Sequence, residues 1–249
     1  MGTTYGPMAS AIVDGLYIYY DAKNPKSYPG ATGLTWYNLV DNRHHAVKGG
    51  SQSPGFPSYN ADGYFNFSGG TGGLNYSRFS CHLIPPFDSA TVEVWWRMTV
   101  PVPDATQVPI GAGGPDGNFY SVNPYYIRCF PNSNSMDYFM GCYQPDYDFI
   151  HRGQANGNWH QSVISWNRIP GSQGTMSVYY DCFVKPNAGF RTCYGDANIT
   201  GHSLRIGVRG DVQGFHFFGD IAVVKYYNRA LSEAEVRQNF DALRGRFGV

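Results

Sequence analysis

The segment Val223–Gly245, VVKYYNRALSEAEVRQNFDALRG, joins a long predicted strand to a strongly helical run. The strand, Phe215–Tyr227, combines aromatic and β-branched residues in an alternating pattern. Ser232 is a favourable N-cap, and Glu235 three residues later completes a capping box. The helix is therefore predicted to begin directly after Ser232.

The predicted helix carries one apolar stripe. Val236, Phe240 and Leu243 recur at helical spacing, and Leu231 can close a hydrophobic staple on Val236. Gly245 is placed to end the helix in a left-handed turn. An isolated helix of about a dozen residues is marginal in water, so we expect the stripe to dock on a sheet.

The rest of the chain has the pattern of short strands separated by turns rich in glycine, proline and asparagine. The predicted strands are Gly15–Asp21, Gly63–Gly69, Ala90–Val100, Tyr125–Phe130, Asp137–Tyr143, Trp159–Trp166, Thr175–Phe183, Ser203–Val208 and Phe215–Tyr227. This spacing predicts an all-β, two-sheet antiparallel sandwich with one short C-terminal helix. No low-complexity linker divides the chain, so a single domain is expected over residues 15–249, preceded by an N-terminal arm at residues 1–14.

Composition and charge disfavour several classes of protein. The 18 basic and 18 acidic residues cancel, whereas nucleic-acid-binding proteins usually show a basic excess. No apolar run approaches the length of a membrane span, and the first residues lack the pattern of a signal peptide. We therefore expect no nucleic-acid and no membrane partner.

The five cysteines are too sparse and irregular for a metal site. Cys182 and Cys193 could face each other across a hairpin, as could Cys129 and Cys142. The alternative is a set of free, partly buried thiols, which a chain made in a reducing compartment would have.

Catalytic motifs are sparse. A glycosidase needs two carboxylates about 5 to 9.5 Å apart, but the chain has only three glutamates, of which two belong to the helix cap. The third, Glu93, shares its strand face with Trp95 and Arg97, and the pair Asp146 and Asp148 falls in a predicted loop. The prediction is that the chain is not an enzyme and has no catalytic residues.

Metal and cofactor motifs are equally sparse. The histidines are isolated or, in Arg43–Ala46, point to opposite faces of a strand, so no metal ligands are assigned. The sequence GAGGPDG, beginning at Gly111, only partly matches a dinucleotide-binding loop and precedes no helix. No cofactor is expected.

Four aromatic residues are candidates for contact with a carbohydrate or a partner protein: Trp36, Tyr37, Trp96 and Trp159. Such rings present an apolar face with a polar edge, which suits sugars and protein interfaces. The alternative is that they pack in the core of the sandwich or at a subunit contact.

Two blocks resemble a known family. Gly15–Gly50, with DAKNPKSYPG at Asp21–Gly30 and WYNL at Trp36–Leu39, is similar to the opening of the concanavalin A-like, laminin G-like jelly-roll domains of tailed-bacteriophage structural proteins. Phe217–Val249 is similar to the ending of the same domains. Asn38 stands where the family usually has aspartate, and the turn after it also departs from the family pattern.

The resemblance implies a jelly-roll sandwich and a non-enzymatic component of a virion, either decorating the capsid or forming part of a tail or fibre. The expected partners are other virion proteins, in a homo-oligomer. A carbohydrate-binding module that acts in adhesion to a host or surface glycan is the alternative function. A glycoside hydrolase is the third hypothesis, because this fold hosts all three classes.

Overall fold

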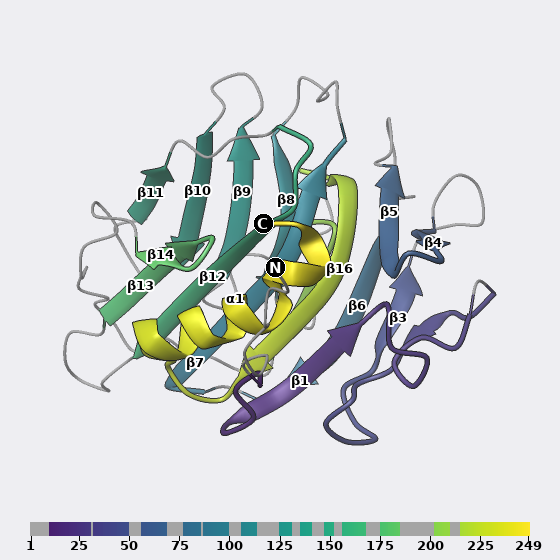
Figure 1. The fold of residues 1–249 in the computed structure, drawn as a ribbon, viewed down its shortest axis with the longest axis horizontal. Helices are drawn as coiled ribbons and strands as arrows, with labels where there is room; N and C mark the ends of the chain where they lie inside the picture. Colours follow the sequence, from purple (N-terminus) through teal and green to yellow (C-terminus); the bar gives the residue numbers. More distant parts are fainter. Residues whose placement is uncertain are drawn as a thin grey trace, which may run out of the picture.

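The protein folds into two packed antiparallel sheets, with the helix α1 (Glu233–Phe247) near the C-terminus of the described residues (Figure 1). The computed structural model describes residues 10–30, 32–49, 56–68, 77–85, 87–99, 106–113, 125–130, 135–140, 147–151, 156–167, 175–184, 202–209 and 215–249. Sheet A contains, in spatial order, β14 (Phe183–Val184), β13 (Thr175–Tyr180), β12 (His160–Asn167), β7 (Ser89–Met98), β16 (Phe218–Tyr227), β5 (Tyr64–Ser68) and β4 (Ser58–Asn60), and β1 (Leu16–Asp21) also pairs with β16. Sheet B contains β11 (Tyr147–His151), β10 (Ser135–Met140), β9 (Tyr125–Phe130), β8 (Gln107–Gly113), β15 (His202–Ile206), β6 (Arg78–Ile84), β3 (Ala46–Gly49) and β2 (Thr35–Trp36). The predicted all-β sandwich with a C-terminal helix is confirmed.

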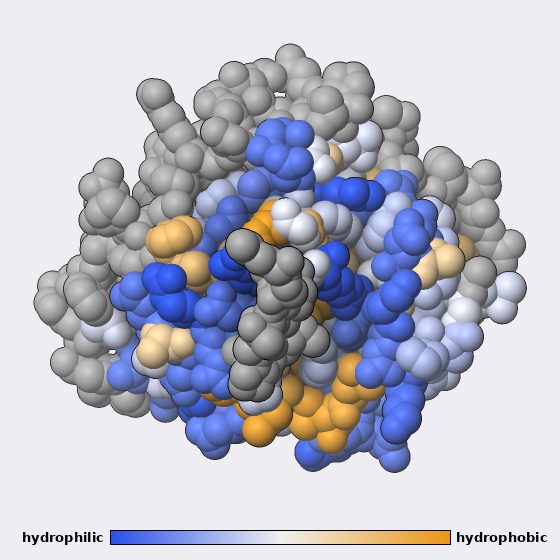
Figure 2. Space-filling model, viewed as in Figure 1, coloured by the Kyte–Doolittle hydropathy of each residue, from blue (hydrophilic) through white to orange (hydrophobic). Residues whose placement is uncertain are grey.

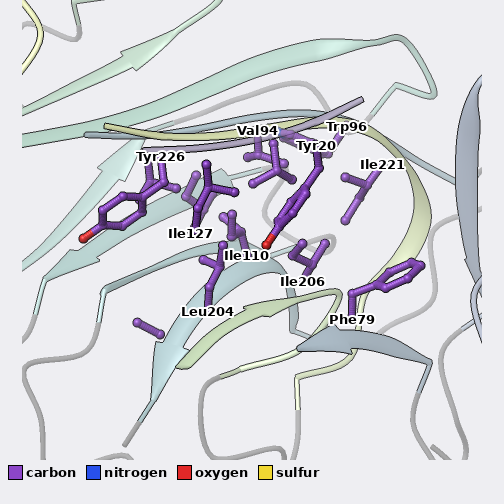
Figure 3. Packing of buried hydrophobic residues seen from close by; sticks show 14 of the residues in the cluster. Tyr20, Phe79, Val94, Trp96, Ile110, Ile127, Leu204, Ile206, Ile221 and Tyr226 are labelled. Carbon is purple, nitrogen blue, oxygen red and sulfur yellow. The ribbon is translucent and has the colours of Figure 1, made fainter. Parts of the chain in front are cut away.

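The core lies between the two sheets. Alternation along β7 turns Val94 and Trp96 inward, where they meet Leu204 and Ile206 of β15 (Figure 3). All four side chains are buried, with exposed fractions of at most 1%. The opposite face of β7 carries Trp95, which packs under the helix instead.

The strand β16 of sheet A changes one of its partners half way along. The first half of β16, Phe218–Ile221, pairs with β5, and the second half, Val223–Tyr227, pairs with β1. A bulge between Ile221 and Val223 marks the change. The end of β1 and the start of β5 therefore meet at one place on sheet A.

Some strands differ from the sequence prediction. Tyr147–His151 forms β11 and pairs with β10, so the prediction of a loop around Asp148 is wrong at that residue. Asp146 lies outside the described residues. The strand β8 was not predicted, because Pro109, Gly111 and Gly113 interrupt its apolar alternation.

The helix α1 (Glu233–Phe247) lies across the outer face of sheet A (Figure 1). Its N-terminus has the predicted capping box, with Ser232 accepting from the Glu235 amide and the Glu235 side chain accepting from the Ser232 amide. The predicted end at Gly245 is wrong. The helix continues to Phe247, and Gly248 forms the left-handed cap with φ 72°.

Contacts of the last turn explain the longer helix. The Phe247 ring stacks on Trp95 with centroids 4.4 Å apart, and Phe240 stacks on the same indole at 5.5 Å. Arg246 pairs with Asp21 of β1 at 2.7 Å. These contacts stabilise a helical turn beyond Gly245, whose own intrinsic preference would end the helix.

A buried ion pair lies beneath α1. Lys225 of β16 and Glu93 of β7 are cross-strand neighbours, and Lys225 Nζ lies 3.1 Å from Glu93 Oε1. Trp95 Nε1 donates to the same oxygen, and Asn239 Nδ2 of α1 donates to Glu93 Oε2. Both charged side chains are at most 1% exposed, so each charge depends on these partners.

The same network reaches the described part of the N-terminal arm. The Ile12 amide donates to Asn239 Oδ1, and its carbonyl accepts from the Tyr227 hydroxyl. Gln238 donates to the Ser10 carbonyl, and Arg229 pairs with Asp14. Residues 10–14 are therefore held against α1 and β16.

We predict that Glu93→Leu lowers the free energy of unfolding by about 3–5 kcal/mol, because Lys225 would remain buried without its counter-charge. The double variant Glu93→Leu/Lys225→Met should recover most of this loss, since both buried charges are then removed. Urea denaturation at neutral pH measures both values. Equal losses in the single and double variants would contradict an important role for the ion pair.

The capping box predicts a pH dependence. Hydrogen bonds from Arg229 hold the folded-state pKa of Glu235 at about 2, below its ordinary value of 4.5. Because the folded pKa is the lower one, the stabilisation is present above pH 4.5 and is lost as the pH falls from 4.5 towards 2. Glu235→Gln should flatten this part of the stability profile, measured by thermal unfolding at each pH. An unchanged slope would refute the assignment.

Candidate functional site

A surface hollow of about 190 Å³ opens on the outer face of sheet A, beside the end of α1. It is lined by Asp62, Gly63, Tyr64, Arg97, Trp159, Arg246 and Phe247. Figure 2 shows this side of the molecule, where hydrophilic residues predominate and apolar residues gather mainly along the lower edge. The hollow therefore combines three aromatic rings with charged groups on a mostly hydrophilic face.

The change of partner along β16 positions the floor of the hollow. It brings Asp21, the last residue of β1, close to the turn that leads into Tyr64 of β5. Gly63 in this turn has φ 92°, and a Cβ there would lie 2.6 Å from Lys23 Cβ. Only glycine fits this close, left-handed turn without strain. Gly63 therefore fixes the point at which β5 begins with Tyr64.

Arg97 of β7 lies between two aromatic rings. Its guanidinium carbon is 4.9 Å from the ring centroids of both Tyr64 and Trp159. Its Nε donates to Asp220 Oδ2 at 2.7 Å, and Asn66 donates to the other carboxylate oxygen. Its bonds to the described residues use only Nε, so both Nη groups can donate to a ligand.

Arg246 forms the opposite wall. Its two Nη groups bond Asp21 Oδ1 and the Gly63 carbonyl, each at 2.7 Å. The guanidinium also lies over the Phe247 ring at 4.9 Å, and Phe247 in turn contacts Trp159 at a centroid distance of 4.9 Å. The end of the helix is thus fixed to both β1 and the β5 turn.

The hollow offers a small ligand two kinds of contact. Tyr64 and Trp159 provide apolar ring surface, while Arg97 provides donors and the exposed Asp62 carboxylate provides acceptors. This combination suits a molecule that has both apolar faces and hydroxyl groups.

The four aromatic candidates from the sequence lie in different places. Trp159 lines the hollow, and Tyr37 is 40% exposed and packs edge-on against His45. Trp36 and Trp96 are 0% and 1% exposed and belong to the core, so they present no surface to a ligand. For Trp36 and Trp96, the prediction of contact with a ligand or partner is therefore wrong, and the alternative of packing in the core of the sandwich is correct.

Sequence reasoning missed most of the hollow. Alternation places Arg97 on the outer face of β7 with Trp95, which was a usable signal. Tyr64 and Arg246 are far from Arg97 in the sequence and meet it only through the folded sheet and helix.

Among the described residues, the others considered for catalysis, metal binding or disulfides do not line the hollow. Glu93 is buried in the ion pair under α1. In the described ranges, no group of three or more His, Cys, Asp or Glu side chains is arranged to hold a metal ion, and no helix there is long and apolar enough to cross a membrane. Cys81 and Cys182 are buried free thiols, while Cys142 and Cys193, needed for the two possible disulfides, lie outside the described residues.

The fold and the sequence identify the class of protein. Residues 69–237 match the concanavalin A-like lectin/glucanases superfamily, and the chain belongs to this family. The predicted concanavalin A-like sandwich is therefore confirmed. No curated protein matches the sequence.

Solved structures show the same fold at low identity. The chain is similar to Trypanosoma rangeli sialidase, with a TM-score of 0.63 and 16% identity over 93% of this chain and 33% of the sialidase. It is also similar to the receptor-binding domain of botulinum neurotoxin type G, with a TM-score of 0.59 and 10% identity over 91% of this chain and 51% of that one. The chain thus spans about a third of the length of the sialidase and about half of the length of the neurotoxin domain.

The sialidase corrects the prediction that the chain is not an enzyme. That prediction is wrong, because chains that contain this fold include an enzyme, so the missing acid pair does not exclude catalysis. At 16% identity the likeness shows the fold alone, and it assigns no active-site residue to this chain.

Proposed function

We propose that this domain is a carbohydrate-binding module that recognises a surface glycan through the hollow at Tyr64, Arg97 and Trp159. The observation that carries the proposal is the pairing of aromatic ring surface with the free Nη groups of Arg97. A sugar has apolar C–H faces and hydroxyl edges, which such a site matches by stacking and by hydrogen bonds.

The size of the hollow limits the ligand. At about 190 Å³ it is smaller than the roughly 300–1,000 Å³ of pockets that enclose drug-sized molecules. It fits one sugar ring of a longer chain, with the neighbouring sugars outside. The ion pairs of Arg97 and Arg246 hold the walls in place before the ligand arrives, which reduces the entropy lost on binding.

Two solved relatives are consistent with a recognition role. One is a sialidase whose structure contains sialic acid, and the other is named as a receptor-binding domain. Their low identity means that they support only the fold on which such a role is built.

We further propose that the domain is displayed on a bacteriophage particle, as part of the capsid, tail or fibre, where glycan binding serves adhesion. The specific observation is that the two blocks that resemble phage structural proteins form one continuous unit. The first block contributes β1, the second contributes β16 and α1, and β1 pairs with β16. Contacts with other virion proteins, in a homo-oligomer, are part of the same proposal.

Screening on a glycan array, followed by calorimetry with the best oligosaccharide, tests the first proposal. Trp159→Ala should weaken binding about tenfold, because a stacking surface worth about 1–1.5 kcal/mol is removed. Tyr37→Ala is the matched control, since it removes an exposed ring outside the hollow, and it should bind like the wild type. Absence of any glycan ligand, or equal loss in both variants, would reject the proposal.

Purified phage particles that encode this chain test the second proposal. The chain should co-sediment with intact particles in a density gradient and be detected there by mass spectrometry. Its presence only in the soluble fraction of the lysate would contradict a virion role without affecting the glycan-binding result.

A further inference from the structure

The outer face of sheet B carries an arginine that points away from the core. Arg205 lies in β15 between Leu204 and Ile206, which both point into the space between the sheets (Figure 3). On the neighbouring strand β6, Ser80 pairs with Arg205, and Phe79 and Cys81 on either side of it are in the core. Alternation therefore places Arg205 and Ser80 side by side on the outer face.

Arg78 belongs to the same face of β6, two residues before Ser80. Arg78 and Arg205 are thus diagonal neighbours across the β6–β15 pair, a separation that long side chains can span. His82, two residues after Ser80, also points outward, and its Nδ1 lies 3.1 Å from Ser203 Oγ of β15.

These side chains contain polar atoms without partners. Arg205 is only 7% exposed, and its Nε is buried. This Nε nevertheless makes no hydrogen bond. Arg78 Nε and Ser80 Oγ are likewise buried and unbonded. Within the part of the chain that the structure describes, neither guanidinium forms an ion pair with a carboxylate. Buried charges in proteins are normally paired, so this arrangement requires an explanation.

The electrostatics of the cluster are those of an uncompensated positive site. Burial and then the charge of Arg78 lower the pKa of Arg205 to about 10. Burial and the charges of Arg205 and Arg78 also lower the pKa of His82. Arg205 and His82 are therefore destabilised as cations first by burial and then by the neighbouring positive charges, and an anion placed among them would relieve this.

Each flanking strand places a glycine next to an arginine of the cluster. Gly111 of β8 pairs with Arg205 on the side away from Ser80, and Gly49 of β3 pairs with Arg78. A Cβ on Gly49 would lie 2.8 Å from Arg78 Nε, so the guanidinium rests on the bare backbone of β3. His82 is exposed and Val47, which pairs with Ser80, is 46% exposed, so the outer face of β6 and β3 reaches solvent beside the cluster.

We propose that Arg78, Ser80 and Arg205 form a binding site for an oxyanion, which is the carboxylate, sulfate or phosphate group of a ligand. The three unsatisfied groups are N–H and O–H donors, and an oxyanion is an acceptor with several oxygens that matches them. The site lies on the opposite sheet from the hollow at Trp159 and does not depend on the function proposed for that hollow.

Calorimetry on the full chain, in a phosphate- and sulfate-free buffer of constant ionic strength, tests this site with four probes. Sodium sulfate and sodium phosphate represent free anions, polygalacturonate oligomers represent an acidic saccharide, and neutral galactan oligomers are their uncharged counterpart. We expect at least one anionic probe to bind at this site. We expect the neutral galactan oligomers not to bind there. Comparing the free ions with the acidic saccharide shows whether the site takes a free inorganic anion or the anionic group of a saccharide.

Arg205→Met and Arg78→Gln should each weaken anion binding by roughly 10- to 100-fold, the value of a charge-assisted hydrogen bond. Arg244→Gln is the matched control, because it removes the same charge from the exposed surface of α1 on the other side of the sandwich. It should leave anion binding unchanged.

Thermal unfolding without any anion gives an independent result. Arg205→Met should raise the unfolding midpoint, because it replaces an unpartnered buried charge with an apolar side chain of similar length. A lower midpoint for this variant would mean that Arg205 has a structural role, and would overturn the proposal. Failure of all anionic probes to bind the wild type, or equal binding by Arg205→Met, Arg78→Gln and Arg244→Gln, would also overturn it.

Discussion

The buried ion pair between Glu93 and Lys225 is the interaction on which the arrangement of sheet A depends. It joins the two central strands, β7 and β16, at a position where neither charge reaches water. Asn239 then attaches α1 to Glu93, and through the Ile12 backbone it attaches the arm as well. One carboxylate is therefore linked to both central strands, to the helix and, through Asn239, to the start of the described chain.

This constraint extends to the candidate site through the helix. Phe247 lies eight residues after Asn239, about 12 Å along the helix axis, and forms one wall of the hollow with Arg246. Stacking of Phe240 and Phe247 on Trp95 prevents α1 from rotating about its anchor. The helix α1 thus covers the outer face of sheet A and also shapes the hollow. Its last turn can form a wall because Phe247 stacks on Trp95 and Arg246 pairs with Asp21.

The sequence predicted the features that depend on local chemistry. The capping box at Ser232, the docking stripe of α1 and the alternation of the main strands all follow from residues close together in the chain. Gly245 was misjudged because Arg246 and Phe247 make distant contacts with Asp21 and Trp95 that outweigh its preference for a turn.

Features that depend on long-range pairing could not be predicted. Trp96 and Trp159 are similar as sequence signals, but strand alternation and the position of β12 bury one and place the other at the hollow. The oxyanion site was invisible for the same reason, because Arg78 and Arg205 become neighbours only when β6 pairs with β15. The two sites lie on opposite faces of the sandwich and use different chemistry, one stacking and one electrostatic.

Binding of a glycan in the hollow beside Trp159 can be observed by nuclear magnetic resonance of the tryptophan side chains. The chain has five tryptophans, so five indole N–H signals are expected, each assignable by substitution with phenylalanine. Titration with a glycan ligand should shift the Trp159 signal while the signals of the buried Trp36 and Trp96 stay in place. A bound glycan that leaves the Trp159 signal unchanged would show that the hollow is not the binding site.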